Sequence, residues 1–167
     1  LQMALVESKD IDMVVMGRPE GPSCYCYANN LLRRYLDMLS GNYPYVLMDN
    51  EAGMEHISRR TTRDVDVLFI MSDHSLAGVR AAGRVVETAR SLNSRIDKIY
   101  LVMNRVDNRI SSKLEEEIKN TGLELIGTIP PDETISEYEL EGKPLILLPD
   151  DSRAVIAIEE IAKKIGV

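Results

Sequence analysis

The strongest constraint on the fold is an alternation of short apolar runs with longer amphipathic segments in the second half of the chain. The apolar runs predict strands at 66–71, 98–103 and 123–126, and the segments predict helices at 75–92, 110–120, 135–140 and 152–165. Strands that are apolar throughout are typical of sheets buried on both faces. A helix is also the usual connection between parallel strands. We therefore predict an α/β protein with a mostly parallel sheet and helices on both faces.

Two of the predicted helices carry a clear apolar stripe at helical spacing. In the helix at 75–92 the stripe consists of Leu76, Val79, Ala82, Val86, Ala89 and Leu92. In the helix at 152–165 the residues expected to face inward are Val155, Ile158, Ile161, Ala162 and Ile165. Gly122, directly after the helix at 110–120, is typical of a helix C-terminus.

The first part of the chain has a weaker pattern. Residues 1–8 are expected to end a helix or to precede a strand, and residues 11–16 are expected to form a strand that Gly17 ends. Residues 29–39 have the spacing of an amphipathic helix. A chain of 167 residues fits one domain, so residues 1–167 are predicted to form a single domain.

Composition excludes several classes of protein. The net charge of −7 argues against a general nucleic-acid binder, which would carry a basic face. No apolar run approaches the roughly 20 residues that span a bilayer, so no membrane partner is expected. The chain has two cysteines, in a C-x-C pair, which is not a disulfide framework. A cytoplasmic location is the default expectation.

The segment 45–56, YVLMDNEAGMEH, is the first candidate for a functional site. Its apolar start at 45–48 predicts a buried strand, and Asp49 follows directly. A carboxylate at the end of a parallel strand lies at the edge where open α/β sheets bind ligands. The alternative is that Asp49 ends the strand and caps the next segment. Glu51, Glu55 and His56 are the further ionisable groups of this segment.

The second candidate is the pair Cys24 and Cys26, in the loop 18–27 at the expected start of a helix. The two residues are either small buried apolar side chains or metal ligands, and a catalytic thiol is disfavoured because no activating His is near in sequence. A helix N-terminus lowers the pKa of a thiol, and the thiolate binds soft or borderline ions. Two ligands do not complete a tetrahedral site, whereas two chains about a two-fold axis would supply four sulfurs.

Two segments together carry a family resemblance. DNEAGMEHISRR at 49–60 is similar to the D-x-x-A-G segment that holds Mg²⁺ and forms a switch in the MinD/nitrogenase-iron-protein class of P-loop ATPases. Together with GRPEGPSCYCYANNLLRR at 17–34, it resembles the CooC-type ATPases, which help to insert nickel into carbon monoxide dehydrogenase. The resemblance implies an ATPase of the P-loop class whose client is carbon monoxide dehydrogenase.

The resemblance also implies roles for individual residues. Asp49 would order Mg²⁺, and Glu51 and Glu55 would shape the switch, so these three are the predicted catalytic residues. Cys24 and Cys26 would hold Ni²⁺ or Zn²⁺ at the interface of a homodimer.

A base-binding site is implied after the strand at 98–103. In MinD-like families an Asn at the position of Asn104, often followed by Lys or Arg as Arg105 is here, recognises the base of ATP. A side-chain amide donates and accepts at once, as an adenine edge requires. The loop 127–132, with Pro130 and Asp132, would pack beside the base. Alternatively, Asn104 only forms a turn, and the sequence N-R-V-D at 104–107 also resembles the N-K-x-D guanine motif, which keeps GTP open.

No G-x-x-x-x-G-K-[ST] phosphate-binding motif occurs in the sequence. If the resemblance holds, the chain is the C-terminal two thirds of a MinD-like nucleotide-binding domain, and alone it is expected neither to hydrolyse ATP nor to bind it tightly. One alternative is a MinD/ParA-like ATP-dependent switch that acts on a protein partner without metal. Another is a binding module without catalysis.

Overall fold

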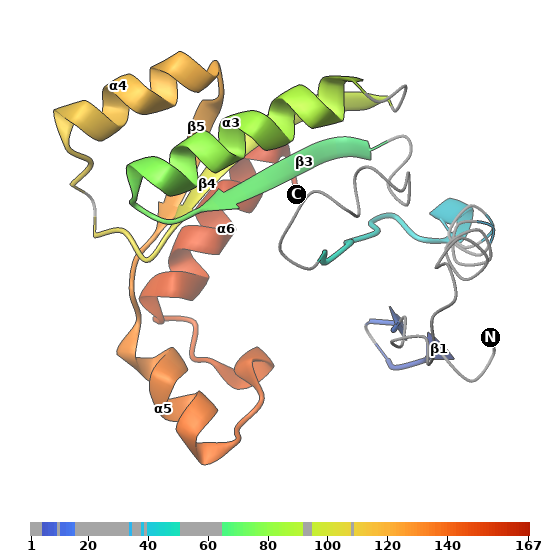
Figure 1. Cartoon of the computed structure of the whole chain (residues 1–167). Helices are drawn as coiled ribbons and strands as arrows, with labels where there is room; N and C mark the ends of the chain where they lie inside the picture. Colours follow the sequence, from blue (N-terminus) through green and yellow to red (C-terminus); the bar gives the residue numbers. More distant parts are fainter. Residues whose placement is uncertain are drawn as a thin grey trace, which may run out of the picture. The chain divides into compact units, whose positions relative to one another are not determined.

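The computed structural model describes residues 5–9, 11–15, 34, 38, 40–50, 65–91, 95–107 and 109–167 (Figure 1). It divides into two compact units, Leu1–Thr61 and Thr62–Val167, which are treated separately below. The expectation of a single domain over 1–167 stays a prediction.

The second unit is built on a parallel three-stranded sheet. Its strands are β3 (Val65–Ser72), β4 (Ile96–Asn104) and β5 (Glu124–Ile129), in the order β3-β4-β5. Both neighbouring pairs are parallel, and the register aligns Ser72 with Met103 and Asn104 with Ile129. The three predicted strands and the mostly parallel sheet are therefore confirmed. The strands β3 and β4 extend one or two residues beyond the predicted runs at each end, and β5 begins one residue later and ends three residues later than predicted.

Helices cover both faces of this sheet, as predicted. They are α3 (Leu76–Ser91), α4 (Ser112–Thr121) and α6 (Arg153–Ile165). The helix α5 (Glu133–Glu141) and a short 3₁₀ turn η3 (Leu145–Leu147) lie between β5 and α6 in the chain and contact each other. Figure 1 shows α3 and α4 over one face and α6 over the other. The sequence order β3-α3-β4-α4-β5 is the helix-connected pattern that joins parallel strands.

The two faces differ in the size of their cores. Successive side chains of a strand point to opposite faces, so on β4 Leu101 and Met103 pack under α3 and α4, whereas Val102 packs under α6. The α3/α4 core has ten buried apolar residues: Ile70, Val79, Ala82, Val86, Leu101, Met103, Val106, Leu114, Ile118 and Leu123. The α6 core has three: Val102, Ile126 and Ile161.

Three helices begin at a side-chain cap and end at a glycine. Ser111, Asp132 and Ser152 are the N-caps of α4, α5 and α6, and each side-chain oxygen accepts a backbone N–H of the first turn. Such caps satisfy donors that have no partner within the helix. All three helices end at a glycine with positive φ, which includes the predicted C-terminal Gly122 at φ 67°.

Ile158, which was predicted to face inward, and Met71 are exposed. Ile158 is 53% exposed, since α6 packs on β5 at the edge of the sheet and buries Ala154 and Ile161 instead. Met71 lies on β3, at the opposite edge, and is also 53% exposed. Met103, on the central strand, is by contrast fully buried.

The first unit contains little regular structure among its described residues. The strands β1 (Leu5–Val6) and β2 (Met13–Val14) pair antiparallel, so the strand predicted at 11–16 is present in part, and η2 (Ser40–Asn42) is a short 3₁₀ turn. Asp12 accepts hydrogen bonds from the Ser8 backbone N–H and the Tyr43 hydroxyl, and the latter bond lowers the Asp12 pKa most.

The buried strand predicted at 45–48 is wrong. Residues 45–50 have no regular secondary structure, and Leu47 is 92% exposed. Apolar sequence alone does not make a strand, because a strand needs a hydrogen-bonded neighbour, and no strand in the described part of the chain pairs with this segment. The helix predicted at 29–39 lies mostly outside the described residues, although Arg34 and Met38 are helical.

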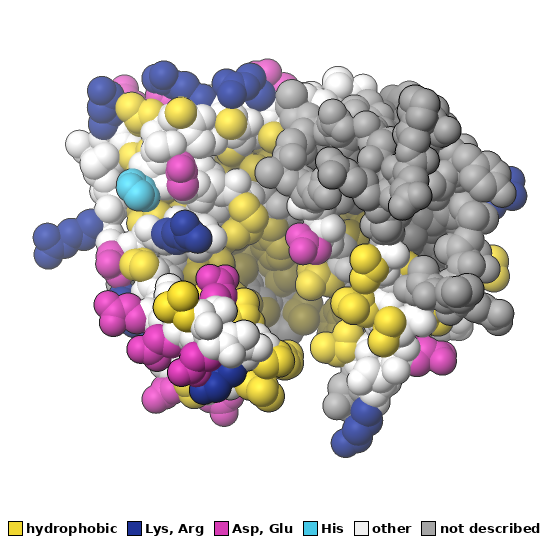
Figure 2. Space-filling model, turned by 60° about the horizontal axis from the view of Figure 1, so that its bottom comes forward, with side chains coloured by type: hydrophobic (Ala, Val, Ile, Leu, Met, Phe, Trp, Pro, Cys, Tyr) yellow, Lys and Arg dark blue, Asp and Glu magenta, His cyan; other side chains and the backbone are white. Residues whose placement is uncertain are grey.

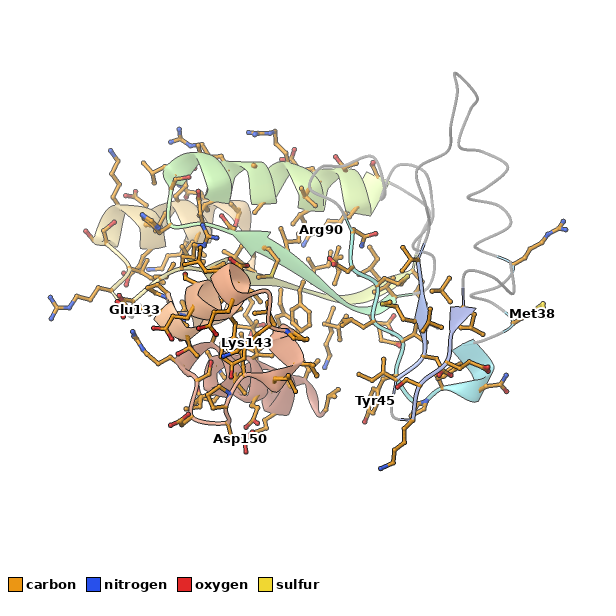
Figure 3. All side chains as sticks on the ribbon, turned by 90° about the horizontal axis from the view of Figure 1, so that it is seen from below. Met38, Tyr45, Arg90, Glu133, Lys143 and Asp150 are labelled. Atoms are coloured by element: carbon orange, nitrogen blue, oxygen red, sulfur yellow. The ribbon has the colours of Figure 1, made fainter. Side chains whose placement is uncertain are left out.

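The face that carries α5 is acidic. Figure 2 shows acidic side chains gathered there among exposed hydrophobic ones, and Figure 3 places Glu133, Lys143 and Asp150 on this part of the molecule. The exposed acidic residues of α5 are Glu133, Glu137, Glu139 and Glu141. A surface of this sign repels phosphate backbones, so it is unsuited to nucleic acid.

Among the described helices, none has the length and apolarity to cross a bilayer.

Candidate functional site

Two loops meet at the carboxyl edge of the sheet, after β4 and after β5. Asn104 is the last residue of β4 and is paired with Ile129, the last residue of β5, so Pro130 leaves the sheet next to Asn104. Both side chains predicted to flank a base therefore start from the same edge, where open α/β sheets bind their ligands.

The loop after β4 has a defined conformation. Arg105 has φ 58°, the left-handed region that non-glycine residues rarely adopt. The Asn104 side-chain oxygen accepts a hydrogen bond from the Arg105 N–H at 2.9 Å, which supports the turn, and both side chains are exposed. The Val106 N–H then donates to the Ile129 carbonyl at 3.0 Å, which joins this loop to the end of β5.

Asp132 fastens the second loop to α6. Its carboxylate accepts from the Thr134 N–H at 3.0 Å, the Ser152 hydroxyl at 2.6 Å and the Ala154 N–H at 3.1 Å. The hydrogen bond from Ser152 is the main reason that the pKa of Asp132 is lowered to about 2. These contacts occupy both carboxylate oxygens and give Asp132 a role in positioning the loop that carries Pro130.

Arg153, in the first turn of α6, bridges the two loops. Its Nη2 donates to Asp107 Oδ1 at 2.6 Å, and its Nη1 donates to the Pro131 carbonyl at 3.4 Å. Sequence reasoning missed Ser152 and Arg153 as site residues, because their partners are 20 to 46 positions away in the chain. The one local signal was a serine at the first position of the predicted helix 152–165, and a serine there is typical only of a cap.

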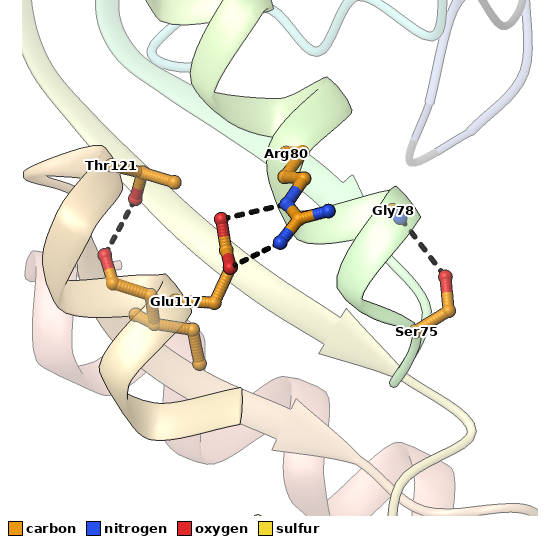
Figure 4. Close-up of polar contacts among 6 residues, drawn as sticks. Ser75, Gly78, Arg80, Glu117 and Thr121 are labelled. Carbon is orange, nitrogen blue, oxygen red and sulfur yellow. Dashed lines mark hydrogen bonds and ion pairs between the residues drawn. The ribbon is translucent and has the colours of Figure 1, made fainter. Parts of the chain in front are cut away.

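A third polar turn ends β3 at the same edge. Asp73 accepts from the Ser75 N–H at 3.0 Å and from the Ser75 hydroxyl at 2.6 Å, and these bonds lower the Asp73 pKa. The Ser75 oxygen in turn accepts from the Gly78 N–H at 2.9 Å (Figure 4). Gly78 has no room for a side chain, since a Cβ would lie 2.3 Å from Asp73 Oδ1. This turn lies between β3 and α3 and starts the helix.

The remaining predicted site residues are not brought together by the described structure. Asp49 is exposed at the end of the irregular segment 45–50, in the first unit. Glu51, Glu55, His56, Cys24 and Cys26 lie outside the described residues. No group of three or more His, Cys, Asp or Glu side chains suited to a metal ion is present in the described part.

The chain is similar in sequence to several known proteins. Residues 4–145 match the model of the CobQ/CobB/MinD/ParA nucleotide-binding domain. An uncharacterised ATP-binding protein of Methanocaldococcus jannaschii is 44% identical over 161 residues, which are 96% of this chain and 64% of that protein. The carbon monoxide dehydrogenase accessory protein CooC of Rhodospirillum rubrum is 27% identical over 143 residues, which are 82% of this chain and 52% of that protein. The chain thus spans less than two thirds of both relatives.

A solved structure shows the same fold. The ParA family ATPase of Chlorobium tepidum TLS matches with a TM-score of 0.73 and 22% identity, over 97% of this chain and 67% of that one. At this identity the match concerns the fold alone. It agrees with the parallel sheet and the helices on both of its faces.

Proposed function

The chain belongs to the CobQ/CobB/MinD/ParA nucleotide-binding family, and from this premise we propose that the intact protein binds and hydrolyses ATP with Mg²⁺. The observation that carries the proposal is the joining of the Asn104 loop to the Pro130 loop at one edge of the sheet, through the hydrogen bond from Val106 to Ile129. The proposal concerns the whole protein, because the chain covers less than two thirds of its relatives.

Properties of the described residues support the proposal of an adenine base at this edge. The Asn104 amide is exposed and has both a donor and an acceptor, which is the pattern that an adenine edge needs. Pro130 would pack against the flat face of the ring, and Arg105 would extend beside it. Asp132 would keep this loop in place through Ser152 and α6.

For the phosphate groups and Mg²⁺, the proposal rests on the D-x-x-A-G pattern in the segment 49–60 of the sequence. Asp49 would hold Mg²⁺, because an exposed carboxylate suits this ion, and Glu51 and Glu55 would shape the adjoining switch. Bound Mg-ATP would supply the transferable phosphoryl group together with the charge that balances it. The sequence has no phosphate-binding loop, so this chain alone is proposed to be inactive.

Within this class we propose a nickel-insertion factor for carbon monoxide dehydrogenase. The proposal is supported by the CooC relative and by the segments 17–34 and 49–60. Cys24 and Cys26 of two chains would provide four thiolates for Ni²⁺ or Zn²⁺ across a homodimer.

A second candidate is an ATP-dependent switch that acts on a protein partner without metal. It is supported by the match of residues 4–145 to the CobQ/CobB/MinD/ParA model, which is named after MinD and ParA proteins among others. Metal analysis of the full-length protein separates the two. The nickel proposal expects about half a metal ion per chain, lost together with dimerisation in a variant with both Cys24→Ser and Cys26→Ser. A protein that dimerises without metal supports the switch instead.

Nucleotide binding is tested by calorimetric titration of the full-length protein with Mg-ATP. The Asn104→Ala variant should bind about tenfold more weakly, as expected for the loss of one or two hydrogen bonds. Asn120→Ala is the matched control, since Asn120 is exposed on α4, away from the two loops, and should bind ATP normally. Equal affinity of the Asn104→Ala variant and the control would contradict the base-binding site.

The chain of 167 residues is a further control for the same titration. It has no phosphate-binding motif, and in P-loop proteins the backbone N–H groups and the Lys of that motif hold the phosphates. We expect no binding by this chain at micromolar concentration. Micromolar binding would show that other residues replace the phosphate-binding loop.

A further inference from the structure

We infer that the ion pair between Arg153 and Asp107 sets the base preference of the proposed nucleotide site. The pair occupies the Asp107 carboxylate, which would otherwise accept hydrogen bonds from guanine and favour that base. The inference rests on the proposed nucleotide binding and makes it more specific. It assigns Arg153 as a specificity-determining residue that acts through Asp107 rather than by touching the nucleotide.

The chemistry of the two bases makes Asp107 the residue that matters. Residues 104–107 read N-R-V-D, which has the Asn and the Asp of a guanine motif at the same spacing. Guanine presents N–H donors at N1 and at its 2-amino group, and a carboxylate accepts from both. Adenine lacks the 2-amino group and has an acceptor at N1. A carboxylate that is not paired with a cation therefore favours guanine over adenine. An amide such as that of Asn104 suits adenine as well.

In the structure the Asp107 carboxylate is held by α6. Asp107 Oδ1 lies 2.6 Å from Arg153 Nη2. The side chains are 64% and 58% exposed, so burial does not determine where the carboxylate lies. The position of Asp107 therefore depends on the guanidinium, which also neutralises its charge.

The guanidinium has a second contact, and hydrogen bonds of the neighbouring residues hold the helix turn that carries it. Arg153 Nη1 also contacts the Pro131 carbonyl, at 3.4 Å. The flanking Ser152 hydroxyl and Ala154 N–H both bind the Asp132 carboxylate. The first turn of α6 is thus fastened to the loop after β5, and Arg153 reaches from there to the loop after β4.

The experiment measures the affinities of the full-length protein for Mg-ATP and Mg-GTP by competition against a fluorescent ATP analogue. The wild type should prefer ATP. The Arg153→Met variant, which keeps much of the side-chain length but loses the charge, should shift the affinity ratio towards GTP by up to about fivefold. That is the size of effect expected for an exposed ion pair.

A double-mutant cycle shows whether the shift acts through the carboxylate. In an Asp107→Asn background, Arg153→Met should leave the ratio unchanged, because no carboxylate remains to be released. Arg153→Lys keeps a positive charge near Asp107 and should retain most of the ATP preference. Arg80→Met removes another exposed arginine ion pair, between α3 and α4, and should not change the ratio.

The outcomes separate this inference from the proposed function. If the wild type binds ATP and Arg153→Met weakens both nucleotides equally, Arg153 is only structural and the inference is wrong. A shift of the same size in the Asp107→Asn background, or a wild type that prefers GTP, also overturns it. If the wild type binds neither nucleotide, the proposed function fails and the inference fails with it.

Discussion

The two faces of the sheet in the second unit are stabilised in different ways. The α3/α4 face buries ten apolar side chains in one core, whereas the α6 face buries three. On the α6 face, polar contacts hold both ends of the helix. Ser152 and Arg153 bind the two edge loops at its start, and Lys164 Nζ donates to the Ile126 carbonyl at 2.7 Å at its end.

This difference separates stability from function. The α3/α4 core supplies most of the apolar burial that stabilises the unit, but α3 and α4 contribute none of the residues proposed to bind the base. The α6 face adds less burial, and its first turn positions both loops of the candidate site. Changes in the first face should therefore alter the free energy of unfolding, and changes in the second should alter the geometry of the site.

The largest expected effect is in the α3/α4 core. Leu101 is fully buried on the central strand, and Leu101→Ala should lower the free energy of unfolding by about 3 kcal/mol, because it leaves a cavity. The matched control is Leu140→Ala, the same chemical change at a side chain that is 89% exposed, with an expected change below about 0.5 kcal/mol. Urea denaturation measures both. Similar losses would mean that Leu140 is covered in the protein as it exists in solution.

The second prediction concerns the close packing of α6 on β5. A Cβ added at Gly127 would lie 2.6 Å from Ile161 Cγ1, so Gly127→Ala should cost about 1–3 kcal/mol of unfolding free energy by overpacking. Ile161→Ala removes the atom that clashes. The double variant should therefore lose less unfolding free energy than the sum of the losses in the two single variants.

Gly41→Ala is the control for this pair, since a Cβ there meets nothing within 4 Å, and urea denaturation should show little change. Strictly additive losses at Gly127 and Ile161 would contradict the close approach of α6 to β5.

Much of the second unit could be predicted from the sequence because its pattern depends on local periodicity. The stripe of α3 has a period near 3.6, and four of its six members, Val79, Ala82, Val86 and Ala89, are buried. Gly122 was predicted correctly as a C-cap, since a left-handed residue is needed there. The strand at 45–48 was wrong because pairing depends on a neighbouring strand, which local sequence does not specify.

The candidate site was only partly predictable for a related reason. Asn104 and Pro130 follow apolar runs, so the edge of the sheet could be inferred from the order of elements. The bonds from Ser152 and Arg153 to Asp132 and Asp107 join residues 20 and 46 positions apart, and no periodicity indicates such contacts. The roles proposed for Asp49 and the two cysteines stay predictions.

The third prediction tests the polar end of the α6 face through pH. Hydrogen bonds lower the Asp132 pKa from 3.8 to about 2 in the folded protein, so the ionised carboxylate stabilises the fold above pH 3.8. This contribution should be lost as the pH falls from 3.8 towards 2. At neutral pH, Asp132→Ala should cost about 1–2 kcal/mol, as expected for a lost N-cap.

Asp132→Asn separates charge from capping, since an amide oxygen still caps α5. The difference in unfolding free energy between wild type and this variant should be present at pH 5 and should shrink towards pH 2, as measured by urea denaturation across that range. A difference that stays constant with pH would show that Asp132 stabilises the protein without its charge.

The smallest expected effect returns to the α3/α4 face, at its surface. Arg80 Nε and Nη2 each lie 3.0 Å from a carboxylate oxygen of Glu117, which joins α3 to α4 and lowers the Glu117 pKa (Figure 4). Although the geometry is bidentate, the Arg80 side chain is 58% exposed, and water and salt screen such pairs. Arg80→Met should therefore change stability less than any substitution above, and the change should disappear at about 1 M salt, where the screening length is about 3 Å. Urea denaturation at low and high salt measures this. If the loss persisted at high salt or approached that of Leu101→Ala, the stability of this face would depend on its surface charges as well as on its buried apolar core.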